Sequence, residues 1–353
     1  MRLTEKEILV KLKNICGEGS PIEICDISPA EDIGFMAEFR IRQGPSFSGI
    51  VEIASLATPK MVKQKISVLR DVTAKAPRVD GCTPILVAPY IGNKQAEMLE
   101  SNDISWIDLS GNMKMKSGKT IYIERRGNPN AYPDTAAIKK IYIGASSLVS
   151  RALLLKPEGF TLQKEILEFI RNRNADITLA TVSKVLKTLE DELLVEKGRD
   201  AVRPVDRLQI LENLKNSYAN SMKAIKQRQC QYFCGDISML TSVLSSNNID
   251  YAACRFYAAQ LKGLAVTEMQ DFYVKDLDSA SIILKAQIPD FAEDREYGNV
   301  MLTEMNNASV WFNIGGKPVK MVDDIELYLE MSVATPRGPK VAEKLKERIL
   351  QKQ

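Results

Sequence analysis

Residues 177–204 read ITLATVSKVLKTLEDELLVEKGRDAVRP, and the pattern within them predicts a helix followed by a two-stranded hairpin. Apolar residues recur at steps of three, four and one along 179–193, which places them on one face of a helix. The residues on this face are Leu179, Val182, Val185, Leu186, Leu189 and Leu193. The Thr178 hydroxyl is expected to cap this helix, because it can accept a hydrogen bond from a backbone N–H that lacks a partner in the first turn.

A hairpin is expected directly after this helix. The apolar segment 194–196 follows without a linker, residues 197–200 (KGRD) are typical of a turn, and a second extended segment covers 201–204. A helix, a strand, a basic turn and a returning strand are typical of the recognition helix and wing of a winged helix-turn-helix.

Two further helices are expected upstream of this stretch. The first covers 146–155, and Thr161 is expected to cap the second, which ends at the turn 172–176. The inward residues of the second helix are predicted to be Leu162, Ile166, Leu167 and Ile170. Three helices and a hairpin in this order predict a central winged helix-turn-helix domain over residues 143–228.

The outward face of the helix at 179–193 has a composition suited to DNA. Its residues are small, hydroxylated or cationic, and no carboxylate occurs before Glu190. Such a helix fits the major groove, while cations on the wing contact backbone phosphates. The residues expected to contact double-stranded DNA are Thr178, Thr181, Ser183, Lys184, Lys187, Thr188, Lys197, Arg199 and Arg203. A winged helix that contacts only another protein is the alternative, since the acidic residues at 190–192 limit how much of the helix can face phosphate.

The segment 1–128 predicts an α/β domain with the element order α-β-β-β-α-β-α-β-β. The run 83–90 is nearly all apolar, as expected of a strand buried on both faces of a sheet. This order, with Glu52 on the third strand, resembles the restriction-endonuclease-like PD-(D/E)xK fold. Residues 128–142 contain two prolines and no clear period, so we expect a linker there.

The nuclease chemistry of that fold needs two acidic residues around a divalent ion and a lysine on the third strand. Glu38 offers the second carboxylate, but Ala54 occupies the expected lysine position, and Lys60 or Lys63 on the next helix is the remaining source. We therefore predict an inactive nuclease-like domain. A metal-dependent nuclease that uses Glu38 and Glu52 is kept as the alternative.

The last segment, 229–353, mixes helical and strand-like stretches and is expected to form a C-terminal mixed α/β domain. Strands are expected at 272–274, 300–302 and 310–312. Asp276 and Asp278 end the first of these runs, as in a nucleotidyltransferase, but no Gly-Ser pair precedes them at a suitable distance. We therefore expect solvated acids at a strand end and no catalytic residue. The chain as a whole is predicted to be multidomain, with α/β and α+β character.

Composition limits the chemistry of the chain. None of the 353 residues is histidine, which excludes Ser-His-Asp and Cys-His catalysis and histidine-ligated zinc. The six cysteines contain no CxxC pair, so we expect reduced thiols, no metal and no cofactor. No run approaches the roughly 18 apolar residues of a membrane span. The N-terminus also lacks a hydrophobic signal core, so the chain is expected in the cytoplasm without a membrane partner.

Charge is distributed unevenly along the chain. Residues 143–228 carry 15 basic and 11 acidic side chains, whereas residues 229–353 carry 13 and 17. This asymmetry favours a central segment that meets phosphates and a terminal segment that meets a different partner.

Two stretches together resemble a known family. Residues 85–115 read ILVAPYIGNKQAEMLESNDISWIDLSGNMKM, in which Asp108, Gly111 and Asn112 are the most specific positions. With the closing stretch at 323–350, DDIELYLEMSVATPRGPKVAEKLKERIL, the chain is similar to AbiEi-type transcriptional regulators, the antitoxins of type IV toxin–antitoxin systems. The resemblance implies a repressor that binds operator DNA of its own operon. It also implies a nucleotidyltransferase-like toxin as a partner of the C-terminal part, while the oligomeric state is left open.

Overall fold

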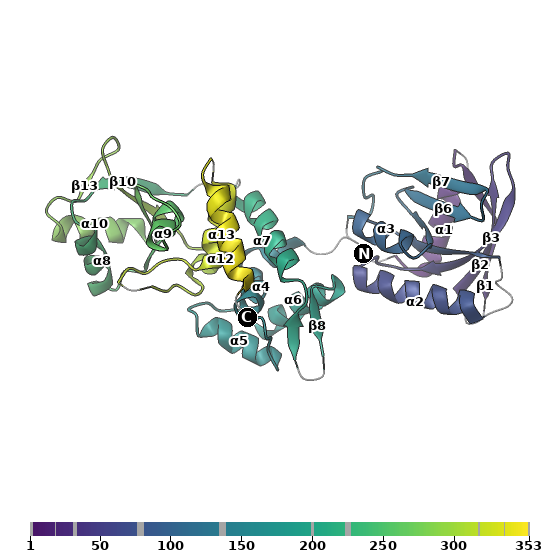
Figure 1. The fold of residues 1–353 in the computed structure, drawn as a ribbon, viewed down its shortest axis with the longest axis horizontal. Helices are drawn as coiled ribbons and strands as arrows, with labels where there is room; N and C mark the ends of the chain where they lie inside the picture. Colours follow the sequence, from purple (N-terminus) through teal and green to yellow (C-terminus); the bar gives the residue numbers. More distant parts are fainter. Residues whose placement is uncertain are drawn as a thin grey trace. The chain divides into compact units, whose positions relative to one another are not determined.

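The structure is a computed structural model with a mixed α/β fold (Figure 1). It describes residues 3–17, 19–30, 34–75, 81–133, 139–198, 201–222, 227–316, 318–334 and 336–351. The chain forms two compact units, Met1–Ile138 with Asp191–Leu193, and Lys139–Glu190 with Leu194–Gln353. The first unit contains one sheet, and the second contains a five-stranded sheet and a two-stranded hairpin.

The first unit contains a seven-stranded sheet in which sequence neighbours are also spatial neighbours, in the order β1 to β7. The central pairs β3–β4 and β4–β5 are parallel, and the pairs on either side are antiparallel. The strands are β1 (Ile22–Ala30), β2 (Gly34–Ile41), β3 (Ser46–Ile53), β4 (Thr83–Ala88), β5 (Ser105–Asp108), β6 (Met113–Ser117) and β7 (Ile121–Arg125). The strand β6 was not expected from the sequence, where its lysines interrupt the apolar pattern.

Helices cover this sheet and bury both of its faces. They are α1 (Glu5–Ile15), α2 (Pro59–Lys75) and α3 (Asn93–Glu100). Alternate residues of β4 explain the continuous apolar run: Ile85 belongs to the same hydrophobic cluster as Leu12 of α1, whereas Leu86 belongs to the cluster of Leu69 and Leu99 from α2 and α3. The prediction of a strand buried on both faces is therefore confirmed.

The second unit begins with helices and a short hairpin. The elements are the 3-10 helices η3 (Lys139–Tyr142) and η4 (Gly144–Ser146), then α4 (Ser147–Leu155), α5 (Gln163–Arg171), α6 (Leu179–Asp191), β8 (Val195–Lys197), β9 (Val202–Pro204) and α7 (Arg207–Met222). The helix and hairpin expected within 177–204 are confirmed, with β8 antiparallel to β9.

A five-stranded sheet follows in the same unit, in the order β11-β12-β14-β10-β13, with only β12 and β14 parallel among its pairs. Its strands are β10 (Gln229–Phe233), β11 (Tyr251–Ala253), β12 (Gln270–Val274), β13 (Ala292–Glu293) and β14 (Val300–Glu304). The helices are α8 (Ile237–Ser246), α9 (Arg255–Leu261), α10 (Leu277–Gln287), α11 (Ala308–Trp311), α12 (Asp324–Val333) and α13 (Gly338–Gln351). The prediction of a strand at 310–312 is wrong, because the short helix α11 covers most of this segment. Asn307 caps that helix, since its side chain accepts a hydrogen bond from the Ser309 N–H.

One hydrophobic cluster joins the first helices of this unit to its last two. Leu148 of α4, Val182 of α6, Leu327 of α12 and Leu345 of α13 all belong to it and are almost fully buried. Segments at the two ends of residues 143–353 therefore share a core, which fixes α4 and α12 against a common interior.

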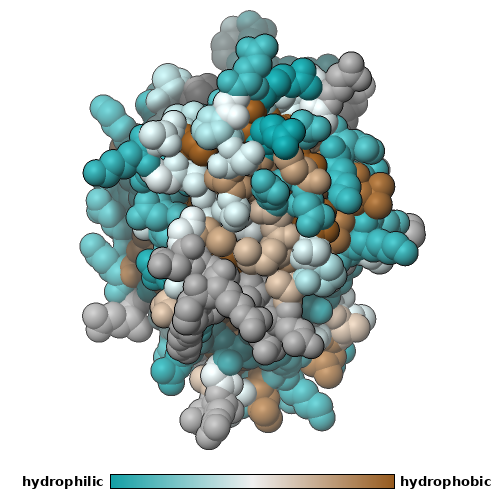
Figure 2. Space-filling view, turned by 90° about the vertical axis from the view of Figure 1, so that its right-hand side faces the viewer, coloured by the Kyte–Doolittle hydropathy of each residue, from teal (hydrophilic) through white to brown (hydrophobic). Residues whose placement is uncertain are grey.

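No helix among the described residues is both long enough and apolar enough to cross a membrane. On the face drawn in Figure 2, hydrophobic residues lie in groups between hydrophilic side chains.

Candidate nucleic-acid interface

Helix α6 is held in place by its apolar face. Val182, Val185, Leu186 and Leu189 are at most 1% exposed and belong to the core of the second unit. The predicted cap is confirmed, because the Thr178 Oγ accepts a hydrogen bond from the Thr181 N–H at 3.2 Å. The buried face fixes the rotation of the helix, so the opposite face must point to solvent.

Both ends of α6 differ from the prediction. Leu179 was expected to be buried but is 39% exposed, because it is the first helical residue and its side chain points back beyond the helix start. Leu193 lies past the helix end at Asp191 with a positive φ of 58°, so it is not on the helical face. An apolar period predicts burial only for residues inside a helix, with a helical turn before and after them. Leu179 has no turn before it, and Leu193 lies beyond the helix end.

The exposed face of α6 carries two cations and a serine. Ser183, Lys184 and Lys187 are exposed, and Thr181 and Thr188 are half-buried. The threonine hydroxyls are already engaged: the Thr178 and Thr181 Oγ atoms lie 2.9 Å apart, and the Thr188 Oγ donates to the Lys184 carbonyl. The two lysines and Ser183 are therefore the polar groups of this face with the freedom to contact a ligand.

The β8–β9 hairpin adds two exposed cations, Lys197 and Arg203. The Gly198 N–H donates to the Ala201 carbonyl at 2.9 Å and closes the turn. Arg203 stands opposite Glu196 in the strand register, which reduces the net positive charge on that part of the hairpin. Arg199, which was also expected to contact DNA, lies outside the described residues.

A third strand segment pairs with this hairpin and was not predicted from the sequence. The Phe160 N–H donates to the Val202 carbonyl at 3.0 Å, and the Val202 N–H donates back at 2.7 Å. Gly159 allows this approach, since its φ is +90° and a Cβ there would lie 2.4 Å from the Val202 oxygen. In the sequence, this pairing could have been inferred only from Gly159 and Phe160, which follow the turn at 156–158.

The second helix, α5, differs from its prediction at the start. Leu162 was expected to face inward but occupies the cap position and is 58% exposed. Thr161 does not cap through its hydroxyl; instead its backbone N–H donates to the Glu165 carboxylate at 2.9 Å. Ile166 and Ile170 are fully buried as expected.

Electrostatics distinguish α6 and the hairpin from the neighbouring helix. Arg171 on α5 is paired with Asp176 at 3.0 Å. Among the described residues, no carboxylate forms an ion pair with Lys184, Lys187, Lys197 or Arg203. Four cations that lack an ion-pair partner within the described part of the chain can contact phosphates without first breaking an ion pair.

The acidic residues considered for nuclease chemistry are not brought together. Glu38 pairs with Ser48 in the strand register, four residues before Glu52, so the two positions are about 13 Å apart along the sheet. Ala54 is 2% exposed and packs in the hydrophobic cluster of α2 and α3, where a lysine would lack solvation. A lysine reaches Glu52 from α2 instead: the Lys65 Nζ lies 2.5 Å from its carboxylate.

Asp108, Gly111 and Asn112 form the turn between β5 and β6. The fully buried Asp108 carboxylate accepts hydrogen bonds from the backbone N–H groups of Ser110 and Asn112 at 2.9 Å, and from the Asn112 side chain. Gly111 adopts a φ of +89°, and the Asn112 Oδ1 accepts from the Asn128 N–H at 2.8 Å. Burial raises the pKa of Asp108 against the opposing effect of these bonds. These three residues therefore stabilise the local fold.

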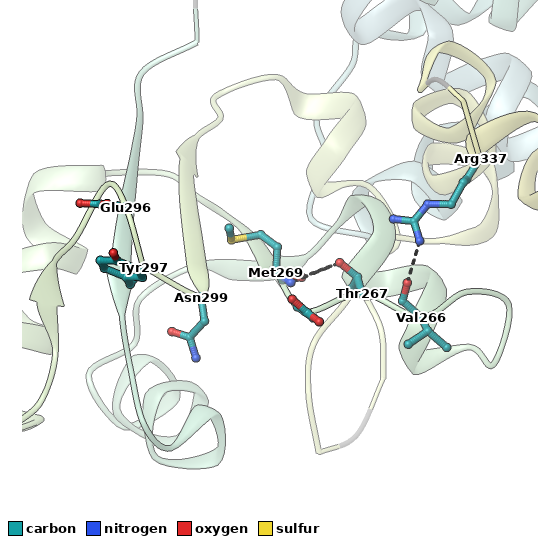
Figure 3. Close-up of a pocket in the computed structure, with 9 residues that line it drawn as sticks. Val266, Thr267, Met269, Glu296, Tyr297, Asn299 and Arg337 are labelled. Atoms are coloured by element: carbon teal, nitrogen blue, oxygen red, sulfur yellow. Dashed lines mark hydrogen bonds between the residues drawn. The ribbon is translucent and has the colours of Figure 1, made fainter.

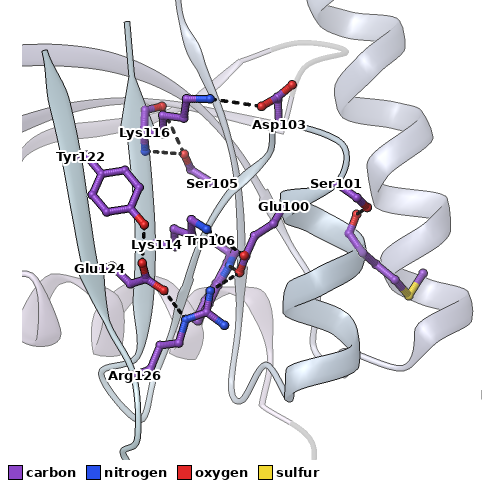
Figure 4. A network of polar contacts seen from close by, with 11 residues as sticks. Glu100, Ser101, Asp103, Ser105, Trp106, Lys114, Lys116, Tyr122, Glu124 and Arg126 are labelled. Carbon is purple, nitrogen blue, oxygen red and sulfur yellow. Dashed lines mark hydrogen bonds and ion pairs between the residues drawn. The ribbon is translucent and has the colours of Figure 1, made fainter. Parts of the chain in front are cut away.

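A polar network lies beside this turn, next to a cavity of about 170 Å³ (Figure 4). Glu100 at its centre accepts from the Lys114 Nζ at 2.8 Å, the Arg126 guanidinium at 2.6 Å and the Trp106 indole at 3.1 Å. These cations are already paired with a carboxylate, in contrast to those of α6.

Another cavity, with a volume of about 690 Å³, lies in the second unit (Figure 3). Residues 266–269, residues 296–299 and Arg337 line it. Glu268 and Glu296 are exposed in it, whereas the Arg337 Nη1 donates to the Val266 carbonyl at 3.4 Å. Its acidic lining does not suit a phosphate ligand.

Acidic residues near the second sheet have structural roles. Asp276 caps α10 by accepting from the Ser279 N–H, and Asp236 caps α8 through the Ser238 and Met239 N–H groups. Asp278 pairs with Arg228 at 2.7 Å. Among the described residues, no group of three or more cysteine, aspartate or glutamate side chains could hold a metal ion.

Comparison of the chain with known protein-family models, with characterised proteins and with solved structures finds no match.

Proposed function

We propose that this chain is a DNA-binding transcription regulator in which α4, α5, α6 and the β8–β9 hairpin form a winged helix-turn-helix. The observation that carries the proposal is the exposed cationic face of α6, with Lys184 and Lys187 unpaired among the described residues. Phe160, which lies between α4 and α5 in the chain and forms a β-bridge with Val202 of the hairpin, supports the proposal. In this arrangement α6 enters the major groove and the hairpin cations contact phosphates.

The experiment that tests the proposal is a gel shift of the full chain on duplex DNA from upstream of its own gene. If Lys184, Lys187, Lys197 and Arg203 each neutralise one phosphate, affinity falls about 100-fold between roughly 50 and 200 mM salt, because bound counterions are released on binding. A chain that binds no duplex even at low salt would contradict the proposal and leave a protein-interaction module as its replacement.

We further propose that the regulator represses its own operon and acts as an antitoxin. This role rests on the resemblance of residues 85–115 and 323–350 to AbiEi-type regulators, not on the geometry of α6. The partner would be a nucleotidyltransferase-like toxin bound by the C-terminal part. Co-expression of the chain with a nucleotidyltransferase-like protein encoded in the same operon tests this role. If that protein inhibits growth, the chain is expected to restore growth. Variants of the chain that no longer bind DNA are expected to restore it as well.

A metal-dependent nuclease in the first unit is the second candidate. The Lys65–Glu52 pair favours it, since it returns a lysine to the acidic residue of β3. The separation of Glu38 from Glu52 weighs against it, because a single metal ion needs its carboxylates within a few ångströms. Incubation of supercoiled DNA with the chain and Mg²⁺ or Mn²⁺ tests it: nicking that is lost in Glu52→Ala would establish a nuclease.

A further inference from the structure

The first turn of α6 presents two apolar side chains to solvent. Leu179 is 39% exposed and Ala180 is exposed. Thr181 is half-buried, and its hydroxyl is 2.9 Å from the Thr178 hydroxyl, which also accepts the Thr181 N–H. The two hydroxyls of this turn are hydrogen-bonded to each other, so Leu179 and Ala180 supply its exposed apolar surface.

The second and third turns of the same face are cationic. Ser183, Lys184 and Lys187 follow the apolar turn along the helix, all of them exposed. No carboxylate occurs on α6 before Glu190. The apolar turn is thus attached to a surface that is complementary in charge to nucleic acid, which selects DNA over an apolar protein segment as its occupant.

The chemistry of the major groove indicates what an apolar turn would contact. In a helix-turn-helix, residues near the start of the recognition helix meet base edges. The only apolar group that the four standard bases present there is the C5 methyl of thymine, and aliphatic side chains recognise it by contact. The exposed side chains of Leu179 and Ala180 have no donor or acceptor, so of the base edges in the major groove they match only the thymine methyl group.

We propose that Leu179, with Ala180 beside it, is a specificity-determining residue that packs against the C5 methyl group of a thymine in the DNA site. This inference rests on the proposed DNA-binding function. Lys184 and Lys187 then supply affinity through phosphates or base acceptors, and Leu179 supplies the preference for thymine at one position of the site.

The test uses the full chain and a duplex enriched by that chain from a randomised library. Each thymine of the duplex is replaced in turn by deoxyuridine, which removes the C5 methyl and keeps every hydrogen-bonding group. We expect one or two positions at which affinity falls about fourfold, the fold-change for burial of one methyl-sized group. Equal affinity for all duplexes, with binding still weakened by salt, would overturn the thymine contact and leave the proposed function intact.

Two variants complete the test. Leu179→Ala is expected to bind the thymine and deoxyuridine duplexes with equal affinity, while its affinity for the deoxyuridine duplex stays near that of the unchanged chain. Leu208→Ala removes a leucine of similar exposure, 48%, from α7 and is expected to keep the fourfold difference. A Leu179→Ala chain that still distinguishes the duplexes would overturn the assignment to Leu179. Failure of the unchanged chain to enrich any duplex would instead overturn the proposed function itself.

Discussion

The Arg151 guanidinium lies 2.6 Å from the Glu326 carboxylate, and the two side chains are only 2% and 1% exposed. This ion pair joins α4, the first helix of the proposed winged helix, to α12, which lies 175 residues further along the chain. Among the residues that the structure describes, the Nε and Nη1 atoms of Arg151 have no hydrogen-bond partner, and neither has the Glu326 Oε1. The proposed DNA-binding segment is therefore anchored to the C-terminal helices through buried charge.

Removing one partner of this pair should destabilise the second unit. Arg151→Met is expected to lower the free energy of unfolding by about 3–5 kcal/mol, because Glu326 is left as an uncompensated buried charge. The double variant Arg151→Met, Glu326→Met should recover most of that loss. Hydrogen exchange of the α4 and α12 amides measures the loss of stability in the single variant and its recovery in the double variant. Equal protection in the single variant and the unchanged chain would contradict a role for the pair in stability.

The buried Glu330 predicts a pH dependence of stability. Burial, followed by the nearby Glu326 charge, raises the pKa of Glu330 to about 8, against the Arg255 N–H bond, the Tyr273 hydroxyl bond and the Arg255 charge. The folded chain then keeps a proton that the unfolded chain releases near the ordinary value of 4.5, so the contribution of Glu330 to stability falls as pH rises from about 4.5 to 8. Glu330→Gln should flatten this slope in urea denaturation, and Glu268→Gln, at an exposed position, should not.

Cysteine reactivity should follow burial. Cys16 is 1% exposed, and burial raises the pKa of its thiol to about 12, which the Arg125 charge only partly offsets. Cys25 on β1 is exposed. In the native chain, iodoacetamide at pH 8 should modify Cys25 within minutes and leave Cys16 unmodified, because the thiolate is the nucleophile. Peptide mass spectrometry measures both sites, and fast labelling of Cys16 would show that α1 opens readily.

The Gly159 contact predicts a local effect on the hairpin. Gly159→Ala combines a positive φ with a clash against the Val202 carbonyl, so we expect a loss of roughly 1–3 kcal/mol in stability. Gly198→Ala in the same hairpin is the matched control, since its Cβ would meet the Ala201 oxygen at an ordinary 3.5 Å. Thermal unfolding compares the two. A similar melting temperature for both variants would contradict the importance of the Phe160–Val202 pairing.

The sequence could predict those parts of the fold in which periodicity repeats. The apolar period of 182–189 located the buried face of α6, and the run at 83–90 located β4, because each is long enough to distinguish a helix from a strand. The segment 310–312 is too short for this distinction, and a capping asparagine made it helical.

The features missed at the candidate site depend on neighbours that are distant in sequence or on chain ends. The exposure of Leu179 follows from its place at the helix start, not from its hydropathy. The pairing of Phe160 with Val202 joins positions 42 residues apart, and Lys65 reaches Glu52 across 13 residues. Contacts of this kind leave no periodic pattern in a single sequence.

The salt dependence of DNA affinity tests the central claim most directly. The full chain is titrated onto duplex DNA from upstream of its own gene, beside the variant Lys184→Ala, Lys187→Ala, Arg203→Ala and a control of equal charge change on α13, Lys340→Ala, Lys344→Ala, Arg348→Ala. If the exposed residues of α6 and the hairpin bind DNA, the first variant loses binding at moderate salt. The slope of its log affinity against log salt becomes shallower by about three, because three phosphate contacts are removed. The α13 control is expected to match the unchanged chain in both affinity and slope. Equal affinity and slope for the first variant and the unchanged chain would contradict the assignment of α6 and the hairpin as the DNA-binding surface.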